Sequence, residues 1–288
     1  MHLLCVLIGC PQPGPDSDSS SDSPAPQASW EEAFDTSSAG SLSGVWGSGP
    51  DDVFIVGGSE AGGEVYHYDG SDWSPMDLPE GMPLLVWVHG FGPDDVWAVG
   101  VDGAAAHYDG SDWSAVETGT EEDLWGVWGA SSEELWVVGG DADVGEPLIL
   151  HVQGETWTPV PLEEGENDRN ATTVFKVFGL GETVFIVGQH GLVLQLQDGA
   201  WRRVSAGAEA NVDLIALWGE SEQHMVAVGG RGNGRISTWD GETLSQEGAF
   251  LTTVDLHAMW GDDQGTTWAV GGTFLEPHRG VALKRTEP

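Results

Sequence analysis

The sequence is poor in cysteine and in basic residues. Its only cysteines, Cys5 and Cys10, lie within the first ten of 288 residues, so we expect no disulfide in the folded domain. Nine Lys and Arg stand against 47 Asp and Glu, and residues 1–168 hold 33 of the acidic residues and none of the basic ones. A net charge of -38 argues against nucleic acid and anionic lipid head groups as ligands and favours cations or basic partners. Adaptation to a saline habitat is an alternative explanation of the same acidity.

The sequence also lacks long apolar runs and clear helix signals. Beyond residue 10, no apolar stretch approaches the roughly 18 residues that span a bilayer. Instead, 43 Gly and 15 Pro interrupt short runs of Val, Ile, Trp and Phe, which is typical of a protein with many short strands. A hydrophobic content of 40% is enough to bury a large core. We therefore predict an all-β fold.

The amino terminus differs in composition from the rest of the chain. The apolar residues 1–10 end in Leu7-Ile8-Gly9-Cys10, which resembles a bacterial lipobox, in which cleavage exposes a cysteine that carries a lipid. Residues 11–29 are low-complexity Pro, Ser and Asp, a composition typical of a disordered linker. This order predicts lipidation at Cys10, the lipid as the sole membrane contact, and a folded domain over 30–288. It also predicts a cell-envelope location, on the outer membrane or cell surface; a short apolar tail without function is the alternative.

One seven-residue stretch, HYDGSDW, occurs at 67–73 and again at 107–113, and it belongs to a longer repeated unit. Six units align on one aromatic or histidine position in the first strand of each, with spacings of 43, 39, 50, 40 and 42 residues. These anchor residues are Trp46, His89, Trp128, Phe178, Trp218 and Trp260. The spacings match the period of propeller blades, and each unit contains four short strand patterns. The sixth unit lacks a fourth strand, and Trp30 in SWEEAF matches the position of Trp73. We therefore predict a six-bladed β-propeller of four-stranded antiparallel blades, closed by an N-terminal strand.

The repeats resemble known propeller families. The corner with Asp69, Gly70 and Trp73 resembles a shortened Asp box of sialidase-type propellers, and the spacing from Gly57-Gly58 to Trp73 is similar to kelch repeats. The VWGSGPDD-type units resemble the Trp- and Gly-rich repeats of myxobacterial surface lipoproteins. Sialidase chemistry, which the first resemblance implies, needs a tyrosine nucleophile and an arginine cluster. The only tyrosines, Tyr66, Tyr68 and Tyr108, fall on third strands away from the channel, which argues against that activity.

The repeated corner is predicted to be structural. Asp69 and Asp109 can accept turn N–H groups, Gly70 and Gly110 can adopt positive φ, and Trp73 and Trp113 can pack between blades. A catalytic role would require one active site in every blade. The anchor tryptophans Trp46, Trp128, Trp218 and Trp260 are likewise assigned to packing, and His89 to a packed core position.

Binding is expected where the repeats differ, at the second-to-third-strand loops and the connections between units. Candidate binding residues in these segments are Glu60, Asp102, His190, Arg231, Asn233, Arg235, His278 and Arg279. Asp141, Asp143 and Glu146 could bind calcium through closely spaced oxygens, although they lack the full EF-hand pattern. No other cofactor is expected. For each of these residues, a solvated loop position is the alternative interpretation.

No nucleophile elbow, phosphate-binding glycine loop or Cys-rich zinc motif occurs in the sequence. We therefore expect a monomeric, non-catalytic binding or scaffolding module for a protein or glycan ligand. The alternative is an extracytoplasmic hydrolase or lyase that uses carboxylates over the central channel, although no catalytic residue is singled out by spacing.

Overall fold

The described part of the chain folds almost entirely as β-strands. The computed structural model describes residues 30–180, 183–204, 213–221, 224–229, 235–239, 244–247, 255–261, 266–273 and 279–286. Within these residues the only helix is η1 (Gln189–Gly191), a single 3-10 turn, and no helix there is long and apolar enough to cross a membrane. The all-β prediction is confirmed.

The strands form four-stranded antiparallel sheets, each built from consecutive strands except the last. The first sheet contains β2 (Ser41–Gly49), β3 (Asp52–Ser59), β4 (Gly62–Tyr68) and β5 (Trp73–Met76), and the second β6 (Leu85–Gly92), β7 (Asp95–Gly100), β8 (Ala105–Tyr108) and β9 (Trp113–Ala115). The third contains β10 (Leu124–Ser131), β11 (Glu134–Gly139), β12 (Leu148–Gln153) and β13 (Thr156–Pro159). The fourth contains β14 (Val174–Leu180), β15 (Thr183–Gly188), β16 (Val193–Gln197) and β17 (Ala200–Arg203). The fifth contains β18 (Leu214–Ser221), β19 (His224–Gly229), β20 (Arg235–Trp239) and β21 (Leu244–Glu247).

The last sheet joins the two ends of the described chain. It contains β22 (Asp255–Gly261), β23 (Thr266–Thr273), β24 (Arg279–Thr286) and β1 (Trp30–Glu32). β1 pairs antiparallel with β24, with Trp30 opposite Arg285 and Glu32 opposite Leu283. The strand that precedes the first repeat therefore supplies the fourth strand of the last sheet, at the position where the repeat alignment places Trp30.

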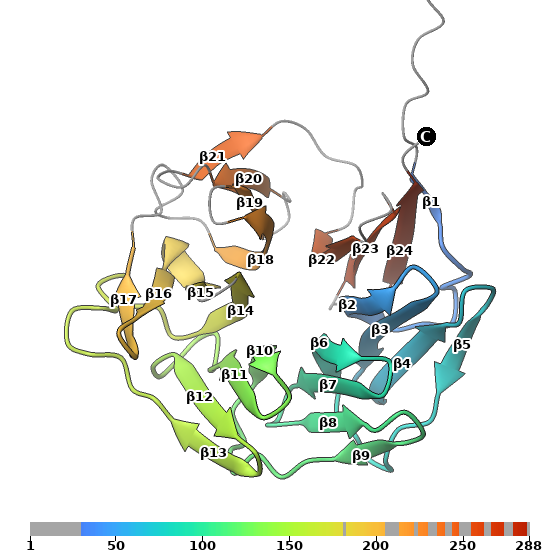
Figure 1. Cartoon of the computed structure of the whole chain (residues 1–288), viewed down its shortest axis with the longest axis horizontal. Coiled ribbons are helices and arrows are strands. Elements are labelled where there is room, and N and C mark those ends of the chain that lie inside the picture. Colours follow the sequence, from blue (N-terminus) through green and yellow to red (C-terminus); the bar gives the residue numbers. More distant parts are fainter. Residues whose placement is uncertain are drawn as a thin grey trace, which may run out of the picture.

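The sheets are arranged around a common axis with their first strands innermost (Figure 1). Innermost strands of neighbouring sheets contact one another, as β2 does with β6 and β10 with β14. Four-stranded blades around an axis are the β-propeller architecture.

The hydrophobic core lies between the sheets, and strand periodicity explains it. Successive side chains of a strand point to opposite faces, so a strand between two sheets must be apolar on both. On β3, Phe54 packs with core residues of the second sheet, whereas Val53 and Ile55 pack with Trp268 of the last sheet. This double burial produces the continuous apolar runs VFIV and LWVV in the second strands.

Candidate functional site

The repeated corners between third and fourth strands have the geometry of a local turn. Asp69 Oδ1 accepts the N–H groups of Ser71 and Asp72 at 2.9 Å, and Asp109 does the same at the equivalent corner. These hydrogen bonds lower the pKa of both carboxyl groups. Gly70 and Gly110 both have φ of +91°, which side chains rarely adopt. The Asp and Gly residues of the corner therefore act on the backbone of the turn.

The corner tryptophans contact the preceding sheet. Ring pairs lie edge-to-face with centroids 5.0 to 6.4 Å apart, a favourable aromatic geometry. The pairs are Trp73 with Trp268, Trp113 with Phe54, and Trp201 with Trp136. Trp113 is only 5% exposed. Each of these tryptophans therefore joins two sheets.

Histidines on three third strands each have their own acidic partner. The pairs are His67–Asp52 at 2.6 Å, His107–Asp95 at 2.9 Å and His151–Glu134 at 2.8 Å. Each imidazole also lies against an aromatic ring of the adjacent strand, with centroids 4.3 to 4.5 Å apart; the His151–Trp136 pair is stacked and the other two are tilted. Among the described residues, no three His, Cys, Asp or Glu side chains gather as a metal site would require. The three histidines therefore belong to three separate local clusters.

The anchor residues of the six units line one cavity on the axis. It has a volume of about 170 Å³, and its lining includes Trp46, His89, Trp128, Phe178, Trp218 and Trp260, here called the axial girdle. Neighbouring girdle side chains adjoin, with ring centroids 6.3 Å apart for both Trp46–His89 and His89–Trp128. All six side chains are partly exposed, unlike the buried residues that precede most of them. The sequence identified these positions but assigned them to packing only.

Glycines allow the girdle residues to lie against the next sheet. A Cβ at Gly90 would lie 2.6 Å from the Trp46 ring, and one at Gly179 would lie 2.1 Å from the Trp128 ring. His89 instead donates a hydrogen bond from Nε2 to the carbonyl of Gly129, at 3.3 Å. Burial lowers the pKa of His89 to about 4, so its ring is neutral at neutral pH.

Three predicted binding residues are exposed on loops between second and third strands, at the end of the sheets opposite the repeated corners. Glu60 follows β3, Asp102 follows β7, and His190 lies in η1. Asp102 and His190 have φ of 54°, and their N–H groups donate to Asp123 and Asp213 at 3.0 Å. Burial raises the pKa of Asp123.

The two accepting aspartates were missed by sequence reasoning. A signal was present, because an Asp stands five residues before the anchor in three units, at Asp123, Asp213 and Asp255. Asp123 and Asp213 lie just before the first strands, outside the second-to-third-strand loops from which binding residues were predicted.

Several predicted residues lie outside the described part of the chain. They are Cys10 and the linker 11–29 at the amino terminus, and Arg231, Asn233 and His278. Arg235 and Arg279 begin β20 and β24, but their side chains lie outside the description as well. The roles predicted for these residues stay predictions.

The predicted calcium residues follow β11. Asp141 Oδ1 accepts the N–H groups of Asp143 at 2.7 Å and Val144 at 3.2 Å, which is a local turn. Asp141, Asp143 and Glu146 are all exposed. Calcium binding here stays a prediction.

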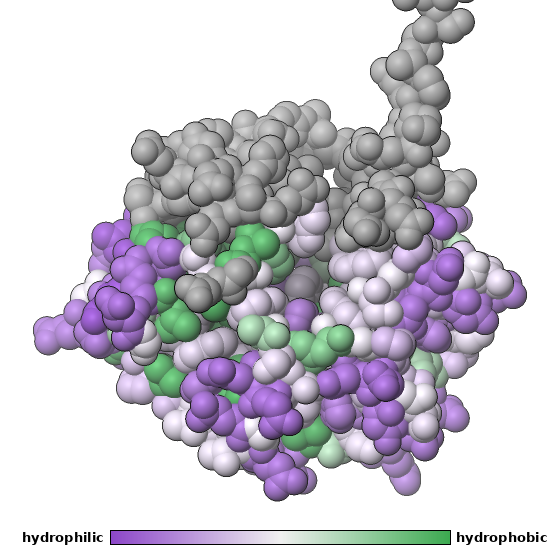
Figure 2. All heavy atoms as spheres, in the orientation of Figure 1, coloured by the Kyte–Doolittle hydropathy of each residue, from purple (hydrophilic) through white to green (hydrophobic). Residues whose placement is uncertain are grey.

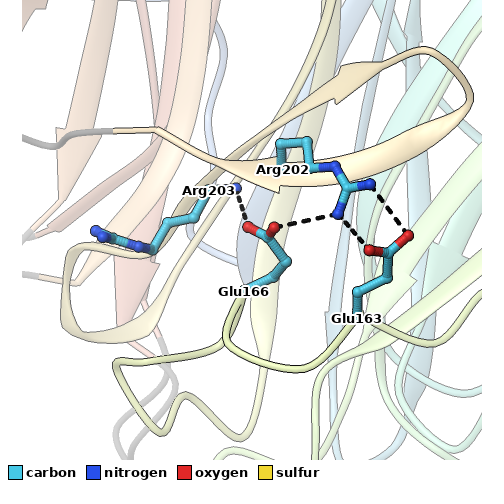
Figure 3. Close-up of polar contacts among 4 residues, drawn as sticks. All are labelled: Glu163, Glu166, Arg202 and Arg203. Carbon is cyan, nitrogen blue, oxygen red and sulfur yellow. Dashed lines mark hydrogen bonds and ion pairs between the residues drawn. The ribbon is translucent and has the colours of Figure 1, made fainter.

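Residues 160–172, within the long connection between the third and fourth sheets, are held by two arginines of β17 (Figure 3). Arg202 binds Glu163 through both terminal nitrogens, and its Nη1 also lies 3.3 Å from Glu166. The N–H of Arg203 donates to Glu166 Oε2 at 2.6 Å, and this bond is the main cause of the lowered pKa of Glu166. Bidentate arginine–carboxylate pairs fix geometry as well as charge. We call residues 160–172 the insert.

A buried glutamine holds the far end of the insert. Gln189 Oε1 accepts from both the N–H and the hydroxyl of Thr172, at 2.9 and 3.1 Å. Its Nε2 donates to the carbonyl of Ala142, at 2.7 Å. Gln189 is 5% exposed, so it joins the insert and the Asp141 loop to the fourth sheet from inside the protein.

A groove lies between the insert and the start of β12. Its volume is about 540 Å³, and its lining combines carboxylates with prolines and aliphatic side chains. The acidic lining residues are Glu146, Glu163 and Glu164, and the apolar ones include Leu148, Val160 and Leu162. The described lining contains no Lys or Arg. We call this feature the acidic groove; the sequence indicated it only through the long 50-residue spacing between two anchors.

The surface of the same region is strongly polar. Figure 2 shows hydrophilic residues gathered at the periphery of the visible face, including over the insert at the left, and hydrophobic residues nearer the axis.

Comparisons with known proteins identify the fold. No protein-family model and no curated protein sequence matches the chain. Solved structures do match: virginiamycin B lyase from Staphylococcus aureus at TM-score 0.63 and 9% identity, covering 89% of this chain and 88% of that one. A YCF48 structure with bound D1 peptide matches at TM-score 0.57 and 15% identity, covering 86% and 77%. The WD40 repeats of RRP9 match at 0.58 and 11%, covering 84% and 76%.

The chain has a β-propeller fold. The matched propellers include a peptide-bound protein and a lyase, so the fold does not decide between binding and catalysis. At these identities the likeness carries the architecture alone.

Proposed function

We propose that the protein is a β-propeller binding module that captures a basic, partly apolar protein or peptide segment in the acidic groove. The observation that carries this proposal is the lining of the groove, where three carboxylates lie beside aliphatic and proline side chains. Glu163 is already paired with Arg202, which leaves Glu146 and Glu164 as the exposed groove carboxylates for a basic ligand. Such a surface complements Lys or Arg side chains that alternate with apolar ones.

Two further features support binding. The insert is held at both ends, by Arg202 and Gln189, so the groove is formed before a ligand arrives and little ordering entropy is lost. The first 168 residues contain no Lys or Arg, so the field over the first three sheets attracts a basic partner.

Two finer features complete the proposal. The sheets form a closed six-bladed ring, supported by the β1–β24 pairing and by a cavity lined from all six innermost strands. Cys10 carries a lipid that tethers the monomeric domain to the cell envelope, on the outer membrane or cell surface, supported by the Leu7-Ile8-Gly9-Cys10 sequence. Loss of acyl incorporation in Cys10→Ala would test the tether.

Binding is better supported than the alternative of a hydrolase or lyase. Among the described residues that line the axial cavity there is no carboxylate, whereas that alternative places carboxylates over the channel. Turnover of a substrate without measurable peptide binding would favour the hydrolase or lyase over the binding module.

A charge-reversed peptide pair tests the proposal. A labelled peptide of alternating Lys and Leu and its Glu and Leu counterpart are titrated into the full chain by fluorescence anisotropy. We expect only the Lys peptide to bind, with an affinity that falls as salt increases. Equal binding of both peptides, or none, contradicts the proposal. Neutral oligosaccharides in the same titration test a glycan, the other ligand class expected from the sequence.

Matched variants locate the binding. Glu146→Gln with Glu164→Gln removes two exposed groove charges and should weaken Lys-peptide binding roughly 2- to 10-fold. Glu155→Gln removes an exposed charge at the corner of the same third sheet and should leave the affinity unchanged. An equal loss in both variants would place the peptide elsewhere on the acidic surface.

A further inference from the structure

The axial girdle is built as a recognition surface and not only as packing. Side chains that merely filled the axis would be buried, yet all six girdle side chains are partly exposed to a shared cavity. The cavity of about 170 Å³ is close to the size of engineered cavities that bind a benzene-sized guest. It can therefore hold one small organic group.

The cavity is aromatic and carries no charge of its own. Five of the six girdle residues are Trp or Phe, and Trp87 adds a further indole to the lining. His89 is neutral at neutral pH because burial lowers its pKa. An anionic guest would meet the negative faces of the aromatic rings, whereas a weakly hydrated cation would be attracted by them.

One lysine of the protein lies over an indole that also lines the cavity. Lys176 Nζ lies 3.7 Å from the centre of the Trp87 ring and donates a hydrogen bond to the carbonyl of Trp125 at 2.7 Å. Lys176 is 5% exposed, burial lowers its pKa, and it is not among the described residues that line the cavity.

Exposed carboxylates lie in the turns after the girdle residues of the first three sheets. The turns that follow the girdle residues carry Asp51, Asp94 and Glu133, all of them exposed. With a net charge of -38 on the whole chain, this end of the propeller concentrates cations and repels anions.

We propose that the axial girdle binds a small organic cation of the trimethylammonium class, of which choline is the simplest hydroxylated example. The cavity volume limits the guest to a head group, the aromatic lining favours a weakly hydrated cation, and the net charge of -38 on the chain supplies the attraction at a distance. This site lies apart from the acidic groove, so it stands whether or not the groove binds a peptide.

Calorimetric titration of the full chain with choline chloride tests the proposal against a neutral isostere, 3,3-dimethylbutan-1-ol. The two compounds share size and shape, and only choline carries charge. We expect choline to bind about tenfold more tightly or better, with quenching of tryptophan fluorescence. Equal affinities would show a simple apolar cavity and overturn the proposal, as would the absence of binding to folded protein.

Variants locate the cation in the girdle. Trp128→Leu keeps an apolar side chain but removes a π-face, and should weaken choline binding about tenfold. Trp157→Leu, in the same third sheet but outside the cavity, is the matched control and should leave the affinity unchanged. His89→Trp adds a sixth aromatic side chain of the girdle and should tighten binding about 2- to 5-fold. Misfolding of His89→Trp cannot raise its affinity for choline, so a gain in this variant supports the proposal. The proposal is contradicted if His89→Trp shows no gain and the two Leu variants lose affinity equally.

Phosphatidylcholine vesicles distinguish the source of the head group. Free choline should bind and should compete with any vesicle association. Vesicle binding without binding of free choline would overturn a soluble cation as the guest. Glu146→Gln should leave choline affinity unchanged, which separates this result from that of the groove.

Discussion

The two ends of the sheets are built on different principles. At the corner end, the first two sheets repeat the same contacts: an Asp accepts two turn N–H groups, a Gly adopts +91°, and a His pairs with a carboxylate. At the loop end one contact recurs, because Asp123 and Asp213 accept the N–H groups of Asp102 and His190. The contacts of the insert, such as Arg202 with Glu163 or Gln189 with Thr172, occur once. Repetition preserves a shape that every blade needs, whereas single contacts create a surface found in one place only.

The comparison predicts the largest loss of stability where a repeated residue joins two sheets. Trp113→Ala removes a 5% exposed ring that packs edge-to-face on Phe54, and should cost roughly 3 to 5 kcal/mol. Urea unfolding followed by fluorescence measures this loss. Val144→Ala, at an exposed position of the loop end, should change stability by less than about 0.5 kcal/mol. A loss below about 1 kcal/mol for Trp113→Ala would contradict its role between sheets.

A corner glycine should come next. Gly110→Ala places a Cβ 2.7 Å from the Cβ of Asp94 in a residue with φ of +91°, so strain and clash together should cost about 3 kcal/mol. Gly119→Ala is the matched control, because Gly119 has φ of +74° with nothing within 4 Å, and should cost about 1 kcal/mol. Equal losses would mean that only backbone strain matters at the corner.

His89, the one described girdle residue that is neither Trp nor Phe, should make the stability of the protein depend on pH. The folded state keeps His89 neutral, with a pKa of about 4, whereas the unfolded state protonates it near 6.5. Between these values the unfolded state binds more protons, so stability falls as pH decreases, by about 2 kcal/mol from pH 7 to pH 5. His89→Phe, which matches Phe178 of the fourth sheet, should remove this part of the decline. Parallel urea curves at both pH values for the two proteins would detect it; identical declines would contradict a buried neutral imidazole.

The smallest effect on stability should come from the insert. Arg202→Gln breaks exposed ion pairs, which contribute less than about 1 kcal/mol. The same change should nevertheless release the insert that forms one wall of the groove. We therefore expect faster amide hydrogen exchange across residues 163–170 and weaker binding of the Lys peptide. If Arg202→Gln strongly destabilised the protein and left amide hydrogen exchange across residues 163–170 unchanged, the insert would contribute to the stability of the fold and not to the shape of the groove.

Most of the fold could be predicted from the sequence because propeller blades are local. Each sheet forms between consecutive strands, so a period of about 40 residues and the corner residues Asp69, Gly70 and Trp73 indicate the blade by themselves. Burial on both faces likewise appears as the apolar runs of the second strands.

The candidate sites depended on contacts between distant residues. Arg202 lies 39 positions from Glu163, and the repeat pattern says nothing about their pairing. Asp123 and Asp213 hold loops of the preceding sheet, which a comparison of loops alone does not reveal.

The sequence by itself determined the blade, because hydrogen bonding and side-chain alternation within a sheet involve neighbouring strands. Only the tertiary structure decided that six anchor side chains share one cavity and that the insert forms one wall of a groove. Both features depend on how separate sheets meet. The period gives the positions of the anchors but not the cavity between their side chains, and the contacts of the insert occur once and have no period.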